Sequence, residues 1–132
     1  MLEEAGSGHS AGPLGLADIF TALYFDVMNI RPEEPEWADR DVFFLSNGHC
    51  VPVQYATMAE AGYFDKDELK TLRKFGSRLQ GHPEREKLPG LENTSGPLGS
   101  GLSQAAGYAY SLHYLEENPH RFVYVVMGDG EL

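Results

Sequence analysis

Apolar residues recur every three or four positions after Pro13, which is the spacing of one face of an α-helix. The positions that carry this pattern are Leu16, Ile19, Phe20, Leu23, Tyr24, Val27 and Met28. Pro13 itself suits the first turn of a helix, because the N–H group that it lacks has no helical partner there. The pattern therefore predicts a helix over residues 13–29.

Two short apolar runs, at residues 42–45 and 122–127, have the character of buried β-strands. The first run follows residues 31–41, where two prolines and five acidic residues predict a solvated loop. Between the two runs, helices are predicted over residues 53–61, closed by Gly62, and over residues 102–116.

The remaining segment between the runs contains one further predicted helix and one long loop. An Asp65-x-x-Glu68 pattern resembles a capping box and predicts a helix from there to about Phe75. Residues 76–101 contain too many turn formers for a regular element. Helices that alternate with buried strands are typical of the α/β class, so we expect a parallel sheet flanked by helices in one domain, residues 1–132.

Composition and charge limit the function classes. The chain is 42% hydrophobic and 23% charged, its longest apolar run is too short to cross a bilayer, and its start lacks the features of a secretory signal. We therefore expect a soluble, cytoplasmic protein that does not bind membranes. The net charge of −10 disfavours nucleic acid as a partner, so an anionic ligand would need a metal ion or backbone amides.

The first candidate site is Gly128-Asp129-Gly130, directly after the second strand. Ligands of open parallel sheets collect at the carboxyl ends of strands, and Asp129 could hold a hard cation there. An ordinary Asp-Gly turn explains the motif equally well when it is taken alone.

The second candidate is the small-residue loop of residues 94–101, which runs into a predicted helix. The free amide groups at such a helix start can receive a diphosphate. A plain connecting loop is the alternative, although long ordered loops in compact domains are often functional.

Three of the five histidines, His9, His49 and His82, adjoin glycine in predicted loops and could share a cleft as hydrogen-bond donors or proton shuttles. His113 and His120 lack this setting and are expected to be surface residues. Cys50 follows His49, but neighbouring side chains generally diverge, so we expect a small buried residue and no Cys–His nucleophile. One cysteine also excludes an internal disulfide framework.

Five segments together resemble the motifs of the transketolase family, the thiamine diphosphate enzymes that transfer two-carbon ketol units between sugar phosphates. They are residues 8–15, 45–49, 81–84, 94–101 and 128–130. In this order they are similar to the family's three histidine loops, its threonine-glycine-proline-leucine-glycine segment and the start of its thiamine diphosphate motif. The resemblance implies the thiamine diphosphate-binding fold, in particular its diphosphate-binding portion.

The resemblance also implies roles for individual residues. His9 and His82 would contact oxygens of the donor ketose and relay protons, and His49 would reach both the diphosphate and the reacting centre. Cofactor contacts would come from His49, Gly96, Pro97, Leu98, Gly128, Asp129 and Gly130. Asp129 would bind a magnesium or calcium ion that bridges the diphosphate, so that the metal attracts the anion despite the acidic chain.

The sequence departs from the family pattern at its end. It stops at Leu132, whereas the family's motif continues to an asparagine that completes the metal site, and the pyrimidine-binding domain is missing. The resemblance thus implies a C-terminally truncated segment or one subunit of a split transketolase. Such a chain would be inactive alone, would need a C-terminal partner subunit or domain in a homo- or hetero-oligomer, and would act on sugar phosphates.

Three alternatives stay open at this point. Deoxyxylulose-phosphate synthase shares the fold and the Gly-Asp-Gly motif but is a lesser match at the second and fourth loops. A zinc hydrolase could use the three histidines and water, although none of them has the close helical spacing of metal ligands. A non-catalytic assembly fragment would keep the fold without the cofactor.

Overall fold

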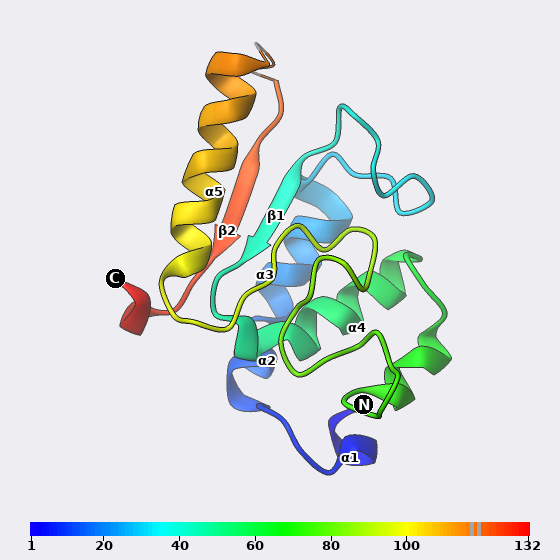
Figure 1. Ribbon diagram of the computed structural model, residues 1–132. Helices are drawn as coiled ribbons and strands as arrows, with labels where there is room; N and C mark the ends of the chain where they lie inside the picture. The colour runs from blue at the N-terminus through cyan, green and yellow to red at the C-terminus, as the bar shows by residue number, and fades with distance from the viewer. Residues whose placement is uncertain (117, 119) are drawn as a thin grey trace.

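The computed structural model describes every residue of the chain except 117 and 119, and in this part of the chain it contains a two-stranded parallel sheet between helices (Figure 1). Strand β1 spans Val42–Leu45 and β2 spans Val123–Val126. The register pairs Val42 with Val123 and Leu45 with Val126. The predicted α/β class and the parallel sheet are confirmed.

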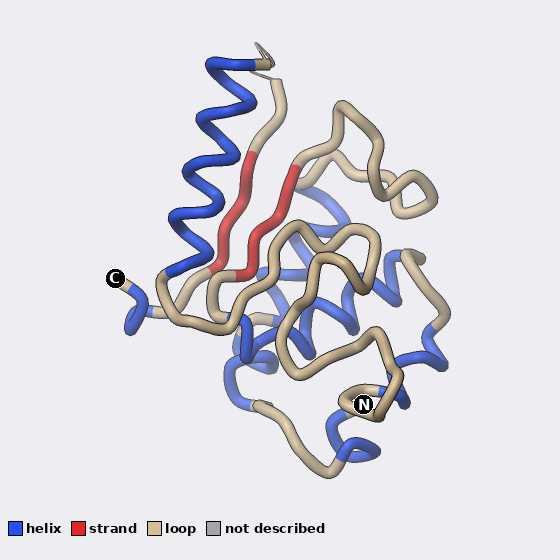
Figure 2. The backbone as a smooth tube through the Cα atoms, in the orientation of Figure 1, coloured by secondary structure: helices blue, strands red, loops and turns tan. Residues whose placement is uncertain are grey.

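The helices differ in length and in type. They are α1 (Leu2–Ala5), α2 (Ala11–Gly15), α3 (Ala17–Ala22), α4 (Val51–Ala61) and α5 (Ser100–Tyr110). π-Helical turns extend α3 through Leu23–Val27 and α5 through Ser111–Leu115, and 3₁₀ turns occupy Gly48–Cys50, Lys66–Thr71 and Asp129–Glu131. Figure 2 shows the long irregular connection that leads to α5. No helix among the described residues is long and apolar enough to cross a membrane.

The helix predicted over residues 13–29 is present but divided. It begins two residues early, at Ala11, and is interrupted at Leu16 between α2 and α3. Of the predicted apolar face, Phe20, Tyr24 and Met28 are buried, whereas Ile19 and Val27 are about half exposed (48% and 49%). The two rings and the thioether of the buried residues pack into the main hydrophobic core.

The other helix predictions had mixed outcomes. The helix of residues 53–61 is confirmed as α4, which begins at Val51 and ends at Gly62 in the left-handed conformation (φ 99°). The prediction of a helix over residues 65–75 is wrong in helix type and in length, because only the 3₁₀ turn Lys66–Thr71 forms. The reason is that the Glu68 carboxylate does not cap the helix start but binds the Arg78 guanidinium through two hydrogen bonds (2.7 and 2.8 Å).

The two faces of the sheet carry hydrophobic cores of different size. On one face, Phe43 and Leu45 join a large core with α3 and α4. On the other face, Val42 and Phe44 pack with Ala105 of α5 in a small core. Strand β1 is therefore buried on both faces, as predicted, whereas β2 is shorter than residues 122–127 and only partly buried.

Candidate functional site at the carboxyl ends of the strands

The two strands end side by side, so the segments that follow them leave the sheet at the same edge. Leu45 pairs with Val126, and Ser46 N donates to Val126 O (2.8 Å). Figure 1 shows both arrowheads pointing to the end of the molecule where α4 begins and where the chain reaches Leu132. The structure thus brings the segment of His49 and the segment of Asp129 to one edge.

The three histidines singled out by sequence lie near one another at this edge. The rings of His9 and His49 have centroids 4.9 Å apart, at an interplanar angle of 54°. A Cβ atom on Gly96 would lie 3.8 Å from Cδ2 of His82, so the third ring faces the loop of residues 94–101. The three residues are therefore neighbours, with His9 and His82 exposed and His49 half-buried, and the shared cleft stays a prediction.

The environment of His82 favours its neutral form. His82 is an exposed residue, but partial desolvation of its ring is the main reason that its pKa is lowered, and the charges of Arg73, His49 and His9 lower the pKa further. The Tyr55 hydroxyl donates to the His82 carbonyl (3.4 Å) and so holds the backbone of this loop. At neutral pH the His82 ring can both donate and accept a hydrogen bond.

The loop of residues 94–101 packs tightly against the segment that carries His49. A Cβ atom on Gly48 would lie 2.5 Å from Ser95 Oγ and 3.1 Å from Gly96 N, and one on Gly101 would lie 2.5 Å from Ser46 Cα. No side chain fits in either gap without displacing its neighbours. The glycines at these two positions are therefore required for the two segments to meet.

Asn93 anchors the start of the same loop to the sheet. Its side-chain Oδ1 accepts from Leu45 N (3.3 Å) and its Nδ2 donates to Leu45 O (3.1 Å). The amide thus takes the place of a neighbouring strand at the last residue of β1. A second link comes from Ser95 N, which donates to Pro83 O (3.3 Å) and joins the loop to the segment of His82.

Glu131 connects three segments of the site, and sequence reasoning missed it. Its carboxylate accepts from Ser46 Oγ (2.6 Å), Gly99 N (3.0 Å) and Gly128 N (2.6 Å). Burial alone would raise the pKa of this carboxyl, but the hydrogen bonds from Gly99, Ser46 and Gly128 lower it below its usual value. The available signal was an acidic residue directly after Gly-Asp-Gly, since carboxylates favour helix N-termini such as that of α5.

Asp129 is exposed, and its Oδ1 accepts from Gly130 N (3.0 Å). In the part of the chain that the structure describes, no group of three His, Cys, Asp or Glu side chains is placed to hold a metal ion. The three histidines therefore do not form the site that a zinc hydrolase requires. Asp129 could supply one oxygen ligand to a hard cation, with the other ligands coming from elsewhere.

The surface beside the histidines combines polar and apolar groups in a way that fits thiamine diphosphate. Leu98 is 59% exposed and presents an apolar side chain, while Pro97 is exposed and the Gly96 backbone partly so. Ser95 Oγ is buried and has no hydrogen-bond partner among the described residues. The diphosphate of the cofactor could be held through a metal ion at the exposed Asp129 carboxylate. A ring of the cofactor could pack against the exposed apolar side chain of Leu98.

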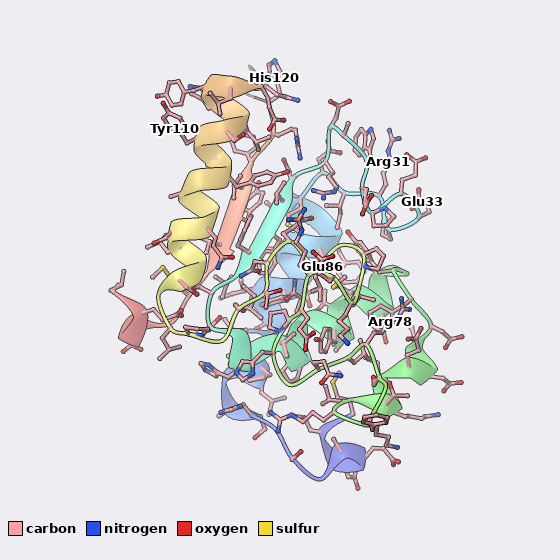
Figure 3. The ribbon with its side chains drawn as sticks, viewed as in Figure 1. Arg31, Glu33, Arg78, Glu86, Tyr110 and His120 are labelled. Carbon is pink, nitrogen blue, oxygen red and sulfur yellow. The ribbon has the colours of Figure 1, made fainter. Side chains whose placement is uncertain are left out.

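The positions of Cys50 and His120 agree with the predictions made for these two residues. Cys50 is buried, accepts from Asn47 Nδ2 (3.5 Å), and burial raises the pKa of its thiol, which agrees with an inert residue. Figure 3 shows His120 beside the far end of the helix that begins as α5, away from the carboxyl edge. His120 is exposed, as expected for a surface residue.

Comparisons with known proteins identify the family of the chain. The family model described as "Transketolase, thiamine diphosphate binding domain" matches residues 1–132. The chain is 42% identical to the chloroplastic transketolase of Solanum tuberosum and 41% identical to transketolase 2 of Vibrio parahaemolyticus. It is 98% covered in both matches, but it spans only 19% and 21% of those two proteins.

Solved structures give the same result. The transketolase of Leishmania mexicana superposes with a TM-score of 0.91 at 40% identity, and that of Campylobacter jejuni with a TM-score of 0.87 at 33% identity. Each match covers 98% of this chain and 21% of the solved chain. The chain therefore belongs to the transketolase family, and its residues 1–132 match the family's thiamine diphosphate-binding domain.

Proposed function

We propose that this chain supplies the diphosphate side of a thiamine diphosphate site in an enzyme that transfers a two-carbon ketol unit from a ketose phosphate to an aldose phosphate. The observation that carries the proposal is the gathering of His9, His49 and His82 at the edge where Asp129 follows β2. Family membership supports the cofactor, because the matched domain is described as thiamine diphosphate-binding.

Each group at this edge has a role in the proposal. Thiamine diphosphate, when bound, supplies the carbanion chemistry, and the protein orients it and stabilises charge on oxygen. His9 and His82 donate to the hydroxyl and carbonyl oxygens of the ketose and move protons, and His49 contacts the diphosphate side. The cofactor contacts are assigned to His49, Gly96, Pro97, Leu98, Gly128, Asp129 and Gly130.

Asp129 is the proposed ligand of a magnesium or calcium ion. The exposure of its carboxylate supports this role, because an oxygen ligand must face the metal ion that it binds. The chain carries a net charge of −10, so a divalent cation is needed to offset the repulsion of a diphosphate. Gly128 and Gly130 let the diphosphate approach the backbone.

The rest of the active site is proposed to come from a pyrimidine-binding domain or subunit. The chain spans about a fifth of the length of the relatives that it matches. We propose that it acts within a homo- or hetero-oligomeric assembly with that partner and has no activity by itself.

Calorimetry on the assembled enzyme tests the proposal. We expect thiamine diphosphate to bind in the presence of Mg²⁺ and to bind at least tenfold more weakly after chelation of the metal. His82→Ala should lower kcat by about 10²-fold, the scale of general acid–base catalysis, while cofactor affinity stays the same. Absence of binding, or equal loss of kcat and cofactor affinity in His82→Ala, would contradict the assignment.

A further inference from the structure

Glu131 holds together two segments that carry different parts of the proposed cofactor site. Its Oε1 atom accepts from the N–H group of Gly99 (3.0 Å), the residue after Leu98. Its Oε2 atom accepts from the N–H group of Gly128 (2.6 Å), the residue before Asp129. Figure 1 shows the C-terminal turn beside the loop that enters α5. One carboxylate therefore joins the segment of Leu98 to the segment of Asp129.

Three neutral donors fix the position of this carboxylate. Besides the two backbone N–H groups, the hydroxyl of Ser46, a buried residue directly after β1, donates to Oε1 (2.6 Å). Glu131 N donates to Gly128 O (3.1 Å) and closes the turn that carries the side chain. Among the described residues Glu131 forms no ion pair. Its location is therefore defined by directional, charge-assisted hydrogen bonds.

The hydrogen bond to Gly99 acts on the part of the loop that presents Leu98. Gly99 lies directly before α5 and has a left-handed backbone (φ 82°), which glycine adopts without strain. A Cβ atom on Gly99 would lie 3.3 Å from Glu131 O, so the loop and the C-terminal turn also meet through their backbones. Leu98 is 59% exposed, so packing does little to fix it and the backbone at Gly99 decides its position. A diphosphate could reach the Gly99 N–H group only by displacing the carboxylate.

We infer that Glu131 is a positioning residue that sets the distance between the Asp129 carboxylate and the Leu98 side chain. This inference rests on the proposed function, in which thiamine diphosphate reaches both groups. A ligand that contacts two segments binds more tightly when their distance is fixed before it arrives, because less freedom is lost on binding. Glu131 itself contacts neither the cofactor nor the metal in this role, since its oxygens accept from protein donors.

A double-mutant cycle on the assembled enzyme tests this link. Calorimetry with excess Mg²⁺ gives the dissociation constant of thiamine diphosphate for the unchanged enzyme, Glu131→Ala, Leu98→Ala and the double variant. We expect Glu131→Ala to raise this constant about tenfold in the unchanged enzyme, the scale of a lost preorganisation. In the Leu98→Ala background the rise should be less than about threefold, because the position of the loop then no longer affects binding. Equal rises in the two backgrounds, or no rise in either, would overturn the inference.

Hydrogen exchange in the enzyme without cofactor separates positioning from a loss of global stability. In Glu131→Gln, the two donors at Oε1 retain the single amide oxygen, so the NH₂ group faces Gly128 N. We expect this variant to accelerate exchange at the Gly128 amide about tenfold more than at the Gly99 amide. Equal acceleration at both amides would assign the effect to global stability and overturn the inference. Because Glu131→Gln keeps two of the three hydrogen bonds, this test does not depend on the folding of Glu131→Ala.

Glu86→Ala is the matched control for the calorimetry, because it also removes one negative charge, from an exposed residue. Loss of a negative charge by itself favours a diphosphate, so weaker binding in Glu131→Ala does not come from charge alone. We expect Glu86→Ala to leave the dissociation constant unchanged, and a rise equal to that of Glu131→Ala would overturn the inference. If the unchanged enzyme binds thiamine diphosphate, a failure of these variants counts against Glu131 alone. If it does not bind, the proposed function fails and the inference fails with it.

Discussion

The segments that follow the two strands are built in opposite ways. After β1, Ser46, Asn47 and Gly48 are buried, and the loop of residues 94–101 packs against them with no room for a larger side chain at Gly48. After β2, Asp129 and Gly130 are exposed and make local contacts, and only the following Glu131 is bound to Ser46 and Gly99. One half of the candidate site is therefore fixed by packing within the chain, and the other half presents its carboxylate to whatever binds there.

Because the two segments differ in packing, we expect substitutions in them to lower stability by different amounts. Substitutions on the packed side should disturb the fold, because close-packed interiors tolerate added volume poorly. Substitutions at the exposed carboxylate should spare the fold and affect binding instead. Four variants follow, from the largest expected effect to none.

Gly101→Ala should have the largest effect. The added Cβ would lie 2.5 Å from Ser46 Cα, so α5 and the segment after β1 must move apart. We expect a loss of about 3 kcal/mol in the free energy of unfolding, measured with urea. Gly107→Ala is the matched control in the same helix, since nothing lies within 4 Å of its added Cβ. That control should be neutral or stabilise by up to about 1 kcal/mol, and equal losses in both variants would refute the packing argument.

Asn93→Ala should come next. It leaves the buried N–H and C=O groups of Leu45 without the partners that the Asn93 amide provides. We expect the free energy of unfolding to fall by about 2 kcal/mol. Hydrogen exchange at the Leu45 amide should accelerate by the factor that corresponds to this free energy. Unchanged protection of that amide would show that the side chain does not anchor the end of β1.

Glu131→Gln should lower the free energy of unfolding by a smaller amount, about 1 kcal/mol. The amide retains one acceptor oxygen but turns its NH₂ group toward one of the N–H donors. Glu86→Gln is its control, since Glu86 is exposed and removal of its charge should change stability by less than about 0.5 kcal/mol. Equal unfolding midpoints for the two variants would mean that Glu131 does not join the two sides.

Asp129→Ala should leave the unfolding free energy within about 0.5 kcal/mol, because the side chain is exposed. The same variant should lose metal-dependent binding of thiamine diphosphate in the assembled enzyme. If Asp129→Ala lowered the free energy of unfolding and still bound the cofactor normally, Asp129 would be a structural residue and the proposed difference between the two segments would be wrong.

Sequence alone could predict much of the fold, where local pattern and tertiary packing agree. The apolar run of residues 42–45 became β1 without adjustment, because it is buried on both faces and bounded by polar residues. The capping-box prediction at Asp65 was wrong because a distant partner, Arg78, engages Glu68. Local pattern carries no information about such a pairing.

In the candidate site, the sequence could single out the histidines beside glycine and the Gly-Asp-Gly motif, because these residue types themselves suggest proton transfer and metal binding; their roles stay predictions. The residues that support the site could not be singled out in this way. Asn93 and Glu131 act through backbone groups that lie 48 and 32 residues away in sequence. These contacts exist only once the loops are folded against the sheet.

We propose that the carboxyl edge holds thiamine diphosphate through a metal ion on Asp129. A crystal structure of the assembled enzyme with thiamine diphosphate and Mn²⁺ in place of Mg²⁺ tests it through the anomalous signal of the metal. We expect one peak about 2.1 Å from an Asp129 carboxylate oxygen, with the His9, His49 and His82 rings around the cofactor. A bound cofactor whose metal lies away from Asp129 would contradict it.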